Sequence, residues 1–310
     1  MEVIEIKNFK DLEQGENPHQ KAYISPVENA IDYEILSRNK ELVYVDYLNL
    51  SEAVKVLGEF FDVNAAVIVK ESLICAASLG STLDEAYAKV IDYDPLSLSG
   101  ATAGFTKSVS LNIAKQLNSM RIKNVIAPDF EKEAFKYLLE TDISLIKINT
   151  GLHELQGFDA KDIRVTPFGI LVQEPNLSKL SKDNFVVVSE VKPTQEQAED
   201  AIFGWKLSKH LKSKSAIVVK DLCAKAIVQC KTNDALCTEI SMDCACECSK
   251  DAVLVVDGSI DSSETINAAI QGRIALIVES GDGKNSKQIL KLADKYGLSM
   301  IYTKIRNNRY

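Results

Sequence analysis

Residues 193–229, PTQEQAEDAIFGWKLSKHLKSKSAIVVKDLCAKAIVQ, contain a predicted helix followed by two predicted strands, and this succession indicates the fold class. Thr194 and Gln197 have the spacing of a capping box directly after Pro193, which predicts the start of a helix. The apolar positions that follow recur with the helical period and are Ala198, Ala201, Ile202 and Trp205. Two runs rich in β-branched residues then predict strands over Ser215–Lys220 and Ala224–Gln229.

The same alternation of apolar runs and helical stretches continues on both sides of this segment. Several of the runs are apolar throughout, which is typical of strands covered on both faces. A helix over Asp84–Val90 is predicted where Thr82 precedes Glu85, and another where Asn285 precedes Gln288. The further predicted strands are Ala65–Val69, Asn124–Ala127, Ser144–Asn149, Gly169–Glu174, Phe185–Glu190, Val253–Asp257, Ile274–Glu279 and Met300–Lys304.

This alternation predicts an α/β protein in which helices pack on sheets. The series of strands and helices occurs twice, so two similar halves are expected. Turn-forming residues cluster between Glu174 and Lys192. This cluster places the boundary between a first domain at residues 1–180 and a second domain at residues 181–310.

The bulk composition limits the class of protein. A chain of 310 residues, 46% of them hydrophobic, suits a soluble globular protein with one large or two medium domains. A net charge of -8 argues against nucleic acid as a partner. No apolar run is long enough to span a bilayer and no signal-peptide pattern is present, so no membrane association is expected. Seven cysteines without such a signal predict reduced thiols and a cytoplasmic location.

The most distinctive local motif is Gly15-Glu16-Asn17-Pro18-His19-Gln20. Its proline has a fixed φ angle and no backbone donor, and it biases the preceding Asn17 towards an extended conformation. Gly15 allows a tight turn just before. The motif therefore predicts a short rigid loop that presents Asn17, His19 and Gln20 together. His19 can either orient a ligand or cap its own turn, and the residues alone favour neither.

This loop resembles the Gly-x-Asn-Pro-His-Gln segment that opens the AICAR transformylase (phosphoribosylaminoimidazolecarboxamide formyltransferase) region of the bifunctional purine-biosynthesis family. The resemblance extends from the loop to the C-terminus and keeps the order of the family's motifs. One of them, Leu48–Ala53, is similar to a helix start of the family. The other similar segments are Val69–Glu71, Ile126–Glu131, Phe203–Lys206, Lys209–Ser213, and Met300–Thr303 with Arg306.

The resemblance implies two tandem cytidine-deaminase-like α/β/α subdomains, usually in an intertwined homodimer with active sites between the subunits. In the family, the amine of AICAR attacks the formyl group of 10-formyltetrahydrofolate. A small-molecule nucleotide and this folate cosubstrate are therefore the expected ligands, with no covalently bound cofactor and no metal. The family's cyclohydrolase region would precede the loop, where this chain has residues 1–14, so ring closure to IMP is not expected of it.

The family's catalytic Lys-His pair corresponds to Lys70 and Glu71 in this chain. The resemblance implies that Lys70 stabilises the oxyanion of the reaction, with Glu71 at the position of the base. A carboxylate next to an ammonium group is a poor base. The alternative is that the two residues form only a surface ion pair, which contributes little to stability.

The resemblance carries over six further site residues, one of which, Glu264, replaces a family aspartate among the catalytic groups. The other five are expected to bind substrate and are Asn17, His19, Lys214 in place of a family asparagine, Asp257 and Arg306. An Arg-Tyr pair that helps to hold the nucleotide in the family is Glu13-Gln14 here, and a glutamate repels phosphate. The stretch that borders the folate pocket corresponds to 256–264 and has lost its aromatic residues.

The segments that are kept are mostly scaffold, and those that are changed are mostly site. Two functions of different class follow from this division. The first is an AICAR formyltransferase of purine biosynthesis. The second is a non-catalytic paralogue that uses the inherited scaffold to bind another ligand or a partner.

Four cysteines lie close together in the sequence, at Cys237, Cys244, Cys246 and Cys248. Thiolates at this density can bind zinc or an iron–sulfur cluster, although the spacing lacks a Cys-x-x-Cys pair. In a continuous helix, the first, second and fourth of them would share one face. Packing as small hydrophobic residues is the favoured interpretation, and a metal site or reactive thiols are the alternatives.

Overall fold

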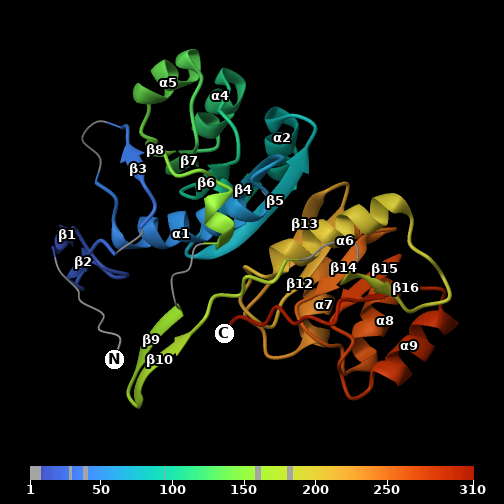
Figure 1. Ribbon diagram of the computed structural model, residues 1–310. Coiled ribbons are helices and arrows are strands. Elements are labelled where there is room, and N and C mark those ends of the chain that lie inside the picture. Colours follow the sequence, from blue (N-terminus) through green and yellow to red (C-terminus); the bar gives the residue numbers. More distant parts are fainter. Residues whose placement is uncertain (1–7, 28–29, 38–40, 94, 158–161, 180–183) are drawn as a thin grey trace. The chain divides into compact units, whose positions relative to one another are not determined.

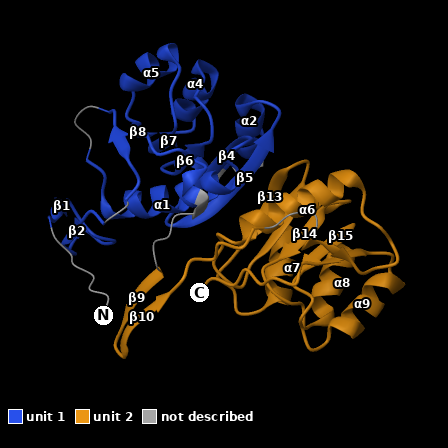
Figure 2. Cartoon of the chain, viewed as in Figure 1, with its two compact units in different colours: residues 1–155 blue, residues 156–310 orange. Residues whose placement is uncertain are grey.

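The computed structural model describes residues 8–27, 30–37, 41–93, 95–157, 162–179 and 184–310 (Figure 1). The chain divides into two compact units, Met1–Leu155 and Gln156–Tyr310 (Figure 2). The subdomain boundary between residues 180 and 181 stays a prediction about the family's architecture. No helix in the described ranges is both long enough and apolar enough to cross a membrane.

Unit 1 contains a mixed sheet with the strand order β5-β4-β6-β7-β8-β3. Strands β6, β7 and β8 are parallel to one another, and the other neighbours are antiparallel. A small antiparallel pair, β1 and β2, precedes this sheet. The elements are β1 Lys10–Leu12, β2 Ala22–Ile24, β3 Tyr33–Ile35, α1 Tyr44–Glu59, β4 Asn64–Lys70, β5 Leu73–Gly80, α2 Leu83–Tyr93, α3 Pro95–Leu98, β6 Thr102–Phe105, α4 Leu111–Ser119, β7 Asn124–Ala127, α5 Lys132–Leu139 and β8 Ser144–Ile148.

Unit 2 repeats this arrangement with the strand order β13-β12-β14-β15-β16-β11. Here β14, β15 and β16 are the parallel strands, and the other neighbours are again antiparallel. The repeat agrees with the two similar halves expected from the sequence. The elements are β9 Asp162–Thr166, β10 Gly169–Gln173, β11 Val186–Val187, α6 Gln195–Ser208, β12 Ala216–Lys220, β13 Cys223–Val228, α7 Asp234–Ala245, β14 Val253–Val256, α8 Ser263–Gln271, β15 Leu276–Glu279, α9 Ser286–Lys295 and β16 Ser299–Tyr302.

Each sheet carries helices on both faces. In unit 2, the backbone of α6 comes so close to one face that a Cβ on Gly204 would lie 2.8 Å from Val219 and 2.7 Å from Val255. The adjacent strand residues Val218 and Leu254 point to the other face, where they join the core under α7, α8 and α9. The mixed α/β class predicted from the sequence is therefore confirmed, with the sheet as the middle of three layers.

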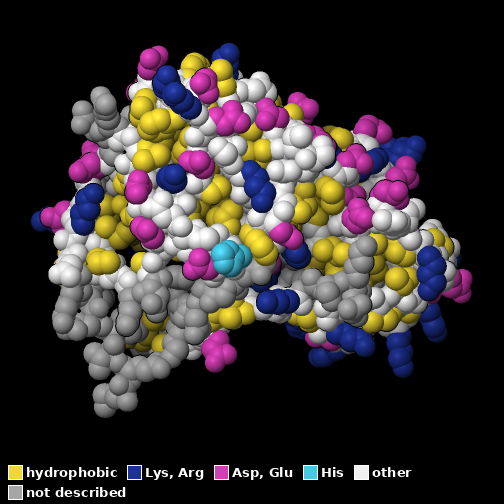
Figure 3. Space-filling view, turned by 45° about the horizontal axis from the view of Figure 1, so that its top comes forward, with side chains coloured by type: hydrophobic (Ala, Val, Ile, Leu, Met, Phe, Trp, Pro, Cys, Tyr) yellow, Lys and Arg dark blue, Asp and Glu magenta, His cyan; other side chains and the backbone are white. Residues whose placement is uncertain are grey.

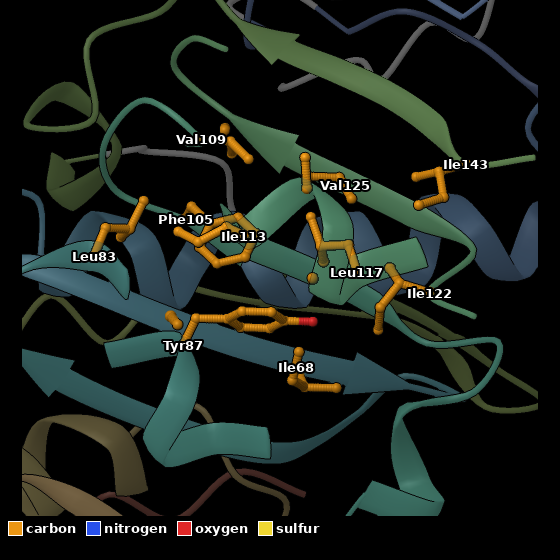
Figure 4. Close-up of a cluster of buried hydrophobic side chains, with 14 of the residues drawn as sticks. Ile68, Leu83, Tyr87, Phe105, Val109, Ile113, Leu117, Ile122, Val125 and Ile143 are labelled. Carbon is orange, nitrogen blue, oxygen red and sulfur yellow. The ribbon is translucent and has the colours of Figure 1, made fainter. Parts of the chain in front are cut away.

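The core of unit 1 lies between its sheet and the helices α2, α4 and α5 (Figure 4). Tyr87 of α2 and Phe105 of β6 are fully buried, and their rings meet edge to face with centroids 5.3 Å apart. Every residue of β6, β7, β14 and β15 is buried. This burial explains why β7, β14 and β15 read as continuous apolar runs without the alternation of a half-exposed strand.

The capping box that opens α6 is confirmed. The N–H of Gln197 donates to Oγ1 of Thr194 at 3.2 Å, and the N–H of Thr194 donates to Oε1 of Gln197 at 3.0 Å. The predicted start of α9 is also confirmed, because the helix begins at Ser286, directly after Asn285. The side chain of Asn285 makes no capping hydrogen bond, and its Nδ2 donates to the carbonyl of Asp261 at 2.9 Å.

Three other expectations need correction. Helix α1 begins at Tyr44, so Leu48–Ala53 lies in the middle of the helix and not at its start. Strand β11 is reduced to two residues of the predicted 185–190. Strand β10 forms as predicted, but all five of its residues are exposed, and it pairs only with β9 outside both large sheets. Strands β5 and β6 and helices α4, α5 and α8 were not predicted as such.

Charges of both signs are distributed over the surface. On the face shown in Figure 3, Lys and Arg side chains are interspersed with Asp and Glu side chains and with apolar groups. This mixed pattern accompanies the net charge of -8.

Candidate functional site

Polar residues from four segments of the chain lie at one edge of the unit 2 sheet, which is the edge formed by the carboxyl ends of the parallel strands β14, β15 and β16. The carboxyl end of β14 meets the start of β12 there, because Val256 pairs with Ala216. Ser215 and Asp257 are the next residues on the two strands, and the N–H of Asp257 donates to the carbonyl of Ser215 at 3.4 Å. Strands β15 and β16 end at the same edge. The carboxyl ends of strands in open α/β sheets are the usual place for a ligand.

The C-terminal tail is fastened to this edge by Asn307. Its N–H donates to the carbonyl of Asp257 at 2.9 Å. Its Nδ2 donates to the carbonyl of Trp205 at 3.1 Å and to Oγ of Ser208 at 2.9 Å, both at the end of α6. Asn307 is fully buried. The tail residues on either side of it are thereby held next to the end of β14.

The side chains of Lys214 and Asn308 lie on either side of Gly258, the residue after Asp257. A Cβ placed on Gly258 would lie 3.0 Å from Oδ1 of Asn308 and 3.4 Å from Nζ of Lys214. The cationic end of Lys214 therefore lies beside the backbone at the end of β14. The carbonyl of Lys214 accepts a hydrogen bond from the Cys237 thiol at 3.2 Å. Desolvation, with Asp257 and Asp234 nearby, raises the pKa of this thiol to about 12.

Two carboxylates at the edge are fully buried, and their hydrogen bonding is incomplete. Neither side-chain oxygen of Asp257 has a hydrogen-bond partner in the described part of the chain. Oε2 of Glu279 accepts from the N–H of Ile260 at 2.7 Å, whereas its Oε1 has no described partner. Burial raises the pKa of Glu279 to about 7. Buried polar groups in proteins are almost always paired, so such exceptions are typical of ligand sites.

Buried aspartates elsewhere in the molecule are paired. Asp46 accepts from Asn124 at 2.7 Å and from Lys123 at 2.8 Å. Asp200 accepts from the backbone of the β12–β13 turn, and Asp234 accepts from Thr265 at 2.8 Å. These three carboxylates have structural roles. Among the buried carboxylates of the described residues, Asp257 and Glu279 are the two with a buried oxygen that has no described partner, and both lie at the edge formed by β14 and β15.

The equivalent edge of unit 1 lacks these acids, which makes it an internal control. The strand registers make Thr106 the counterpart of Asp257, and Ala127 the counterpart of Glu279. Oγ1 of Thr106 donates to the carbonyl of Val63 at 2.6 Å and accepts from the N–H of Ala65 at 2.8 Å. In unit 1, these positions hold a hydroxyl whose hydrogen bonds are complete and an alanine. The fold therefore does not require two buried acids there.

Three of the predicted site residues, Lys214, Asp257 and Arg306, lie at this edge of unit 2. Arg306 is exposed, and its Nε donates to Oδ2 of Asp282 at 2.7 Å. A weaker contact of 3.5 Å joins its Nη2 to Oγ of Ser259. A ligand phosphate at this guanidinium would have to compete with the Asp282 carboxylate.

Glu264, the fourth predicted residue in unit 2, lies in the first turn of α8. It is exposed, and its carboxylate accepts a hydrogen bond from the hydroxyl of Ser262. This hydrogen bond is the main cause of the lowered pKa of Glu264. A carboxylate held in its ionised form at a helix start suits the helix dipole, and its catalytic role stays a prediction.

Lys70 and Glu71 belong to unit 1, at the turn between β4 and β5. Glu71 has a φ of 53° and Ser72 a φ of 62°, and the N–H of Ser72 donates to Oδ1 of Asn49 at 2.7 Å. Lys70 and Glu71 form no ion pair within the described residues. Unit 2 has the same turn, in which Lys220 is followed by Asp221 with a φ of 57°. The lysine followed by an acid is therefore a feature of this turn in both units.

The loop at 15–20 closes on itself between β1 and β2. The N–H of Gly15 donates to the carbonyl of Gln20 at 2.8 Å, and both the backbone N–H and Nδ2 of Asn17 donate to Oε1 of Gln20, at 3.0 and 2.8 Å. The turn is thus held by Asn17 and Gln20. The imidazole of His19 is exposed. Its role in binding stays a prediction, as does that of Asn17.

The cysteine cluster differs from the helix expected for it. Helix α7 ends at Ala245, and Cys246 has a φ of 49°, so the cysteines do not share one continuous helical face. Cys237 is buried as the packing interpretation predicts, whereas Cys244, Cys246 and Cys248 are exposed. Within the described residues, no three His, Cys, Asp or Glu side chains are grouped so that they could hold a metal ion.

Sequence reasoning missed two residues of the edge, Glu279 and Asn307. Glu279 had a usable signal, because it is a single acid that ends the apolar run of β15. The same signal, an acid directly after a buried parallel strand, accompanies Asp257. Asn307 had no comparable signal, since a polar residue in a C-terminal tail is ordinarily solvated.

Comparisons with known proteins give one consistent picture. A family model described as AICARFT/IMPCHase bienzyme matches residues 2–243. The chain is 34% identical to the bifunctional purine biosynthesis protein purH of Dictyostelium discoideum over 317 residues, covering 98% of this chain and 58% of that protein.

Two bacterial relatives carry the same description. The PurH protein of Thermoanaerobacter sp. (strain X514) is 32% identical over 306 residues, which cover 97% of this chain and 59% of the relative. The PurH protein of Persephonella marina is 32% identical over 312 residues, which cover 96% of this chain and 59% of the relative. The chain thus spans less than two thirds of the length of these relatives.

Proposed function

Because the chain belongs to the AICARFT/IMPCHase bienzyme family, we propose that it is an AICAR formyltransferase of purine biosynthesis. The amine of AICAR would attack the formyl carbon of 10-formyltetrahydrofolate, the amine would lose a proton, and tetrahydrofolate would leave with one. The observation that carries this proposal is Asp257. It stands at the family's aspartate position as a buried carboxylate whose two oxygens have no described partner.

The edge of unit 2 offers the groups that binding requires. Asp257 is an acceptor for N–H groups of a heterocycle, and the neighbouring Lys214 and Arg306 supply positive charge. Lys70 of unit 1 is proposed to stabilise the oxyanion that forms on the attacked formyl group, as its position in the family implies. No covalently bound cofactor and no metal enter this scheme, and 10-formyltetrahydrofolate is the formyl donor.

Formyl transfer tests this proposal directly. We expect AICAR to bind with micromolar affinity in calorimetry, and the formylated product to appear when 10-formyltetrahydrofolate is added. Replacing Lys70 by alanine is expected to lower kcat by about 10²–10³-fold, the usual loss for one oxyanion donor. Lys220→Ala is the matched control, because Lys220 occupies the equivalent turn of unit 2, and its kcat should equal that of the wild type.

The second candidate function is a non-catalytic paralogue. It is favoured by Glu71, which replaces the family's histidine and lies exposed in a turn whose unit 2 counterpart also carries an acid. Binding of AICAR without any formyl transfer would identify this second function. If neither AICAR nor the folate raises the melting temperature, the formyltransferase proposal is wrong.

The finer fold assignment also belongs to the proposal. We propose that each unit is a cytidine-deaminase-like α/β/α subdomain, a view supported by the shared strand order and by helices on both faces of each sheet.

A cytoplasmic location is also proposed. It is supported by seven cysteines that are all free thiols.

A homodimer is the proposed assembly, and the β9–β10 hairpin supports it. The cross-strand pairs of the hairpin place four apolar side chains on one face, and Phe168 lies fully exposed at its tip. An isolated two-stranded hairpin is marginally stable in water, so this face requires cover. On the opposite face Asp162 and Arg164 form an ion pair with each other at 3.3 Å, so it is the apolar face that a second copy would cover. The four apolar residues are Ile163, Val165, Ile170 and Val172.

Charge on the apolar face should break this dimer. We expect Val165→Asp combined with Ile170→Asp to convert a dimer into a monomer in sedimentation velocity, since burying two carboxylates in an apolar contact is strongly unfavourable. Arg164→Ala on the other face of the hairpin is the control and should leave the dimer intact. A wild-type monomer, or a dimer that survives both aspartates, contradicts this role of the hairpin.

A further inference from the structure

Glu279 stands out among the groups that the proposed reaction does not use. It is fully buried at the carboxyl end of β15. Oε2 accepts from the N–H of Ile260 at 2.7 Å, whereas Oε1 has no described partner. The N–H of the next residue, Ser280, donates to the carbonyl of Gly258 at 3.0 Å. The carboxylate thus joins the segment after β14 to the segment after β15.

These two segments border the edge that holds the candidate ligand site. A Cβ on Gly283 would lie 2.7 Å from Oδ1 of Asp261 and 3.2 Å from the carbonyl of Ile260, so the segments are in close contact. Arg306 touches both of them, through Asp282 on one and Ser259 on the other. A change at Glu279 therefore reaches the cation that is expected to bind substrate.

The charges around Glu279 favour its neutral form. Asp261 and Asp282, one from each segment, act on it with repulsive charge, and the phenol of Tyr302 faces it from β16. Asp257 ends the neighbouring strand β14. Arg306 is the nearby cation, and it is already paired with Asp282. Burial is the largest cause of the raised pKa of Glu279, about 7 instead of the usual 4.5.

We infer that Glu279 is a positioning residue, which in its protonated form holds the segments 258–262 and 280–283 together and so keeps the edge in its binding geometry. When the carboxyl ionises, a buried charge without a cation must be solvated, and the edge opens. This inference deepens the proposed function, because AICAR affinity should follow the same proton.

The apo protein provides the first test, which does not depend on AICAR. The folded state holds the proton of Glu279 more tightly than the unfolded state, so the contribution of Glu279 to stability is fully present below about pH 4.5 and is lost as the pH rises through about 7. The melting temperature of the wild type minus that of Glu279→Gln should therefore fall between pH 5 and pH 8. Glutamine keeps an acceptor for Ile260 and cannot ionise.

Two controls make this measurement specific. Glu264→Gln removes an exposed carboxylate of the same unit, and its difference from the wild type should not change between pH 5 and pH 8. Glu279→Leu removes the acceptor, and it should increase amide exchange of Ile260 where the glutamine variant does not. If Glu279→Gln retains the pH dependence of the wild type, or Glu279→Leu leaves Ile260 protected, the inference is wrong.

Ligand binding provides the second test. With a pKa near 7, the protonated fraction of Glu279 at pH 8 is about one tenth, so AICAR affinity of the wild type should fall about fivefold between pH 7 and pH 8. Glu279→Gln should remove most of this pH dependence of the affinity. Failure of AICAR to bind at any pH would contradict the proposed function. The melting temperatures of the free protein would then decide the inference about Glu279.

Discussion

Replacing Asn307 by alanine is expected to lower the free energy of unfolding by about 3 kcal/mol and to abolish AICAR binding. The alanine variant loses the two hydrogen bonds that Nδ2 donates to α6, to the carbonyl of Trp205 and to the hydroxyl oxygen of Ser208, in a fully buried position. The tail then loses its side-chain attachment to α6, and we expect Arg306 and Asn308 to shift from their positions at the edge. Urea denaturation measures the first effect and calorimetry with AICAR measures the second.

Asn176→Ala is the matched control for this variant. Asn176 is exposed. Its side chain donates to Oδ1 of Asn307 at 3.3 Å and accepts from the N–H and the hydroxyl of Ser178, so its loss removes hydrogen bonds at the periphery of the site. We expect a cost below about 1 kcal/mol and unchanged binding. An Asn307→Ala protein that binds AICAR as tightly as the wild type would show that the tail does not build the site.

Replacing Asp257 by asparagine is expected to change stability and binding in opposite directions. Asp257 is fully buried, and neither of its oxygens has a described hydrogen-bond partner, so the carboxylate destabilises the folded state of the free protein. Asparagine removes the buried charge at nearly the same volume. We expect the free protein to gain about 2 kcal/mol in stability and AICAR affinity to fall at least 100-fold.

Thermal unfolding with and without AICAR separates the two effects. The variant should melt at a higher temperature than the wild type when free, and AICAR should raise the melting temperature of the wild type alone. Glu239→Gln provides the comparison, since its carboxylate is exposed on α7 outside the candidate site and its loss should change neither quantity much. A less stable Asp257→Asn protein would indicate a structural role for the carboxylate.

Asp257 and Glu279 are groups that the fold does not need. Unit 1 has the same topology and places Thr106 and Ala127 where unit 2 places Asp257 and Glu279. The internal repeat therefore distinguishes site from scaffold without any second protein. By the same comparison, Glu71 occupies a turn position that Asp221 occupies in unit 2, which weakens its claim to be a catalytic base.

Local patterns predicted most of the regular structure correctly. The apolar runs located β7 and β14 to within a residue, and the capping box located the start of α6. Such predictions succeed because backbone hydrogen bonds and caps join residues a few positions apart. The prediction at Asn285 likewise located the start of α9, although the side chain of Asn285 bonds to the Asp261 carbonyl and does not cap the helix.

Burial was much harder to foresee than secondary structure. The run at β10 is as apolar as a core strand, and yet it is exposed and paired only with β9. Cys244, Cys246 and Cys248 were expected to pack as small hydrophobic residues and are exposed. Whether an apolar side chain is covered depends on which elements lie against it, and the residues beside it in the chain do not specify this.

For this protein, the order of residues alone determined the α/β class and the family, and it predicted three residues that the structure places at the candidate site: Lys214, Asp257 and Arg306. The folded arrangement was needed to show that Asp257 and Glu279 are buried without complete pairing, and that Asn307 ties the tail to α6. The reason is physical. Periodicity and motifs are properties of neighbouring residues, whereas desolvation and missing partners arise only when segments far apart in the chain pack together.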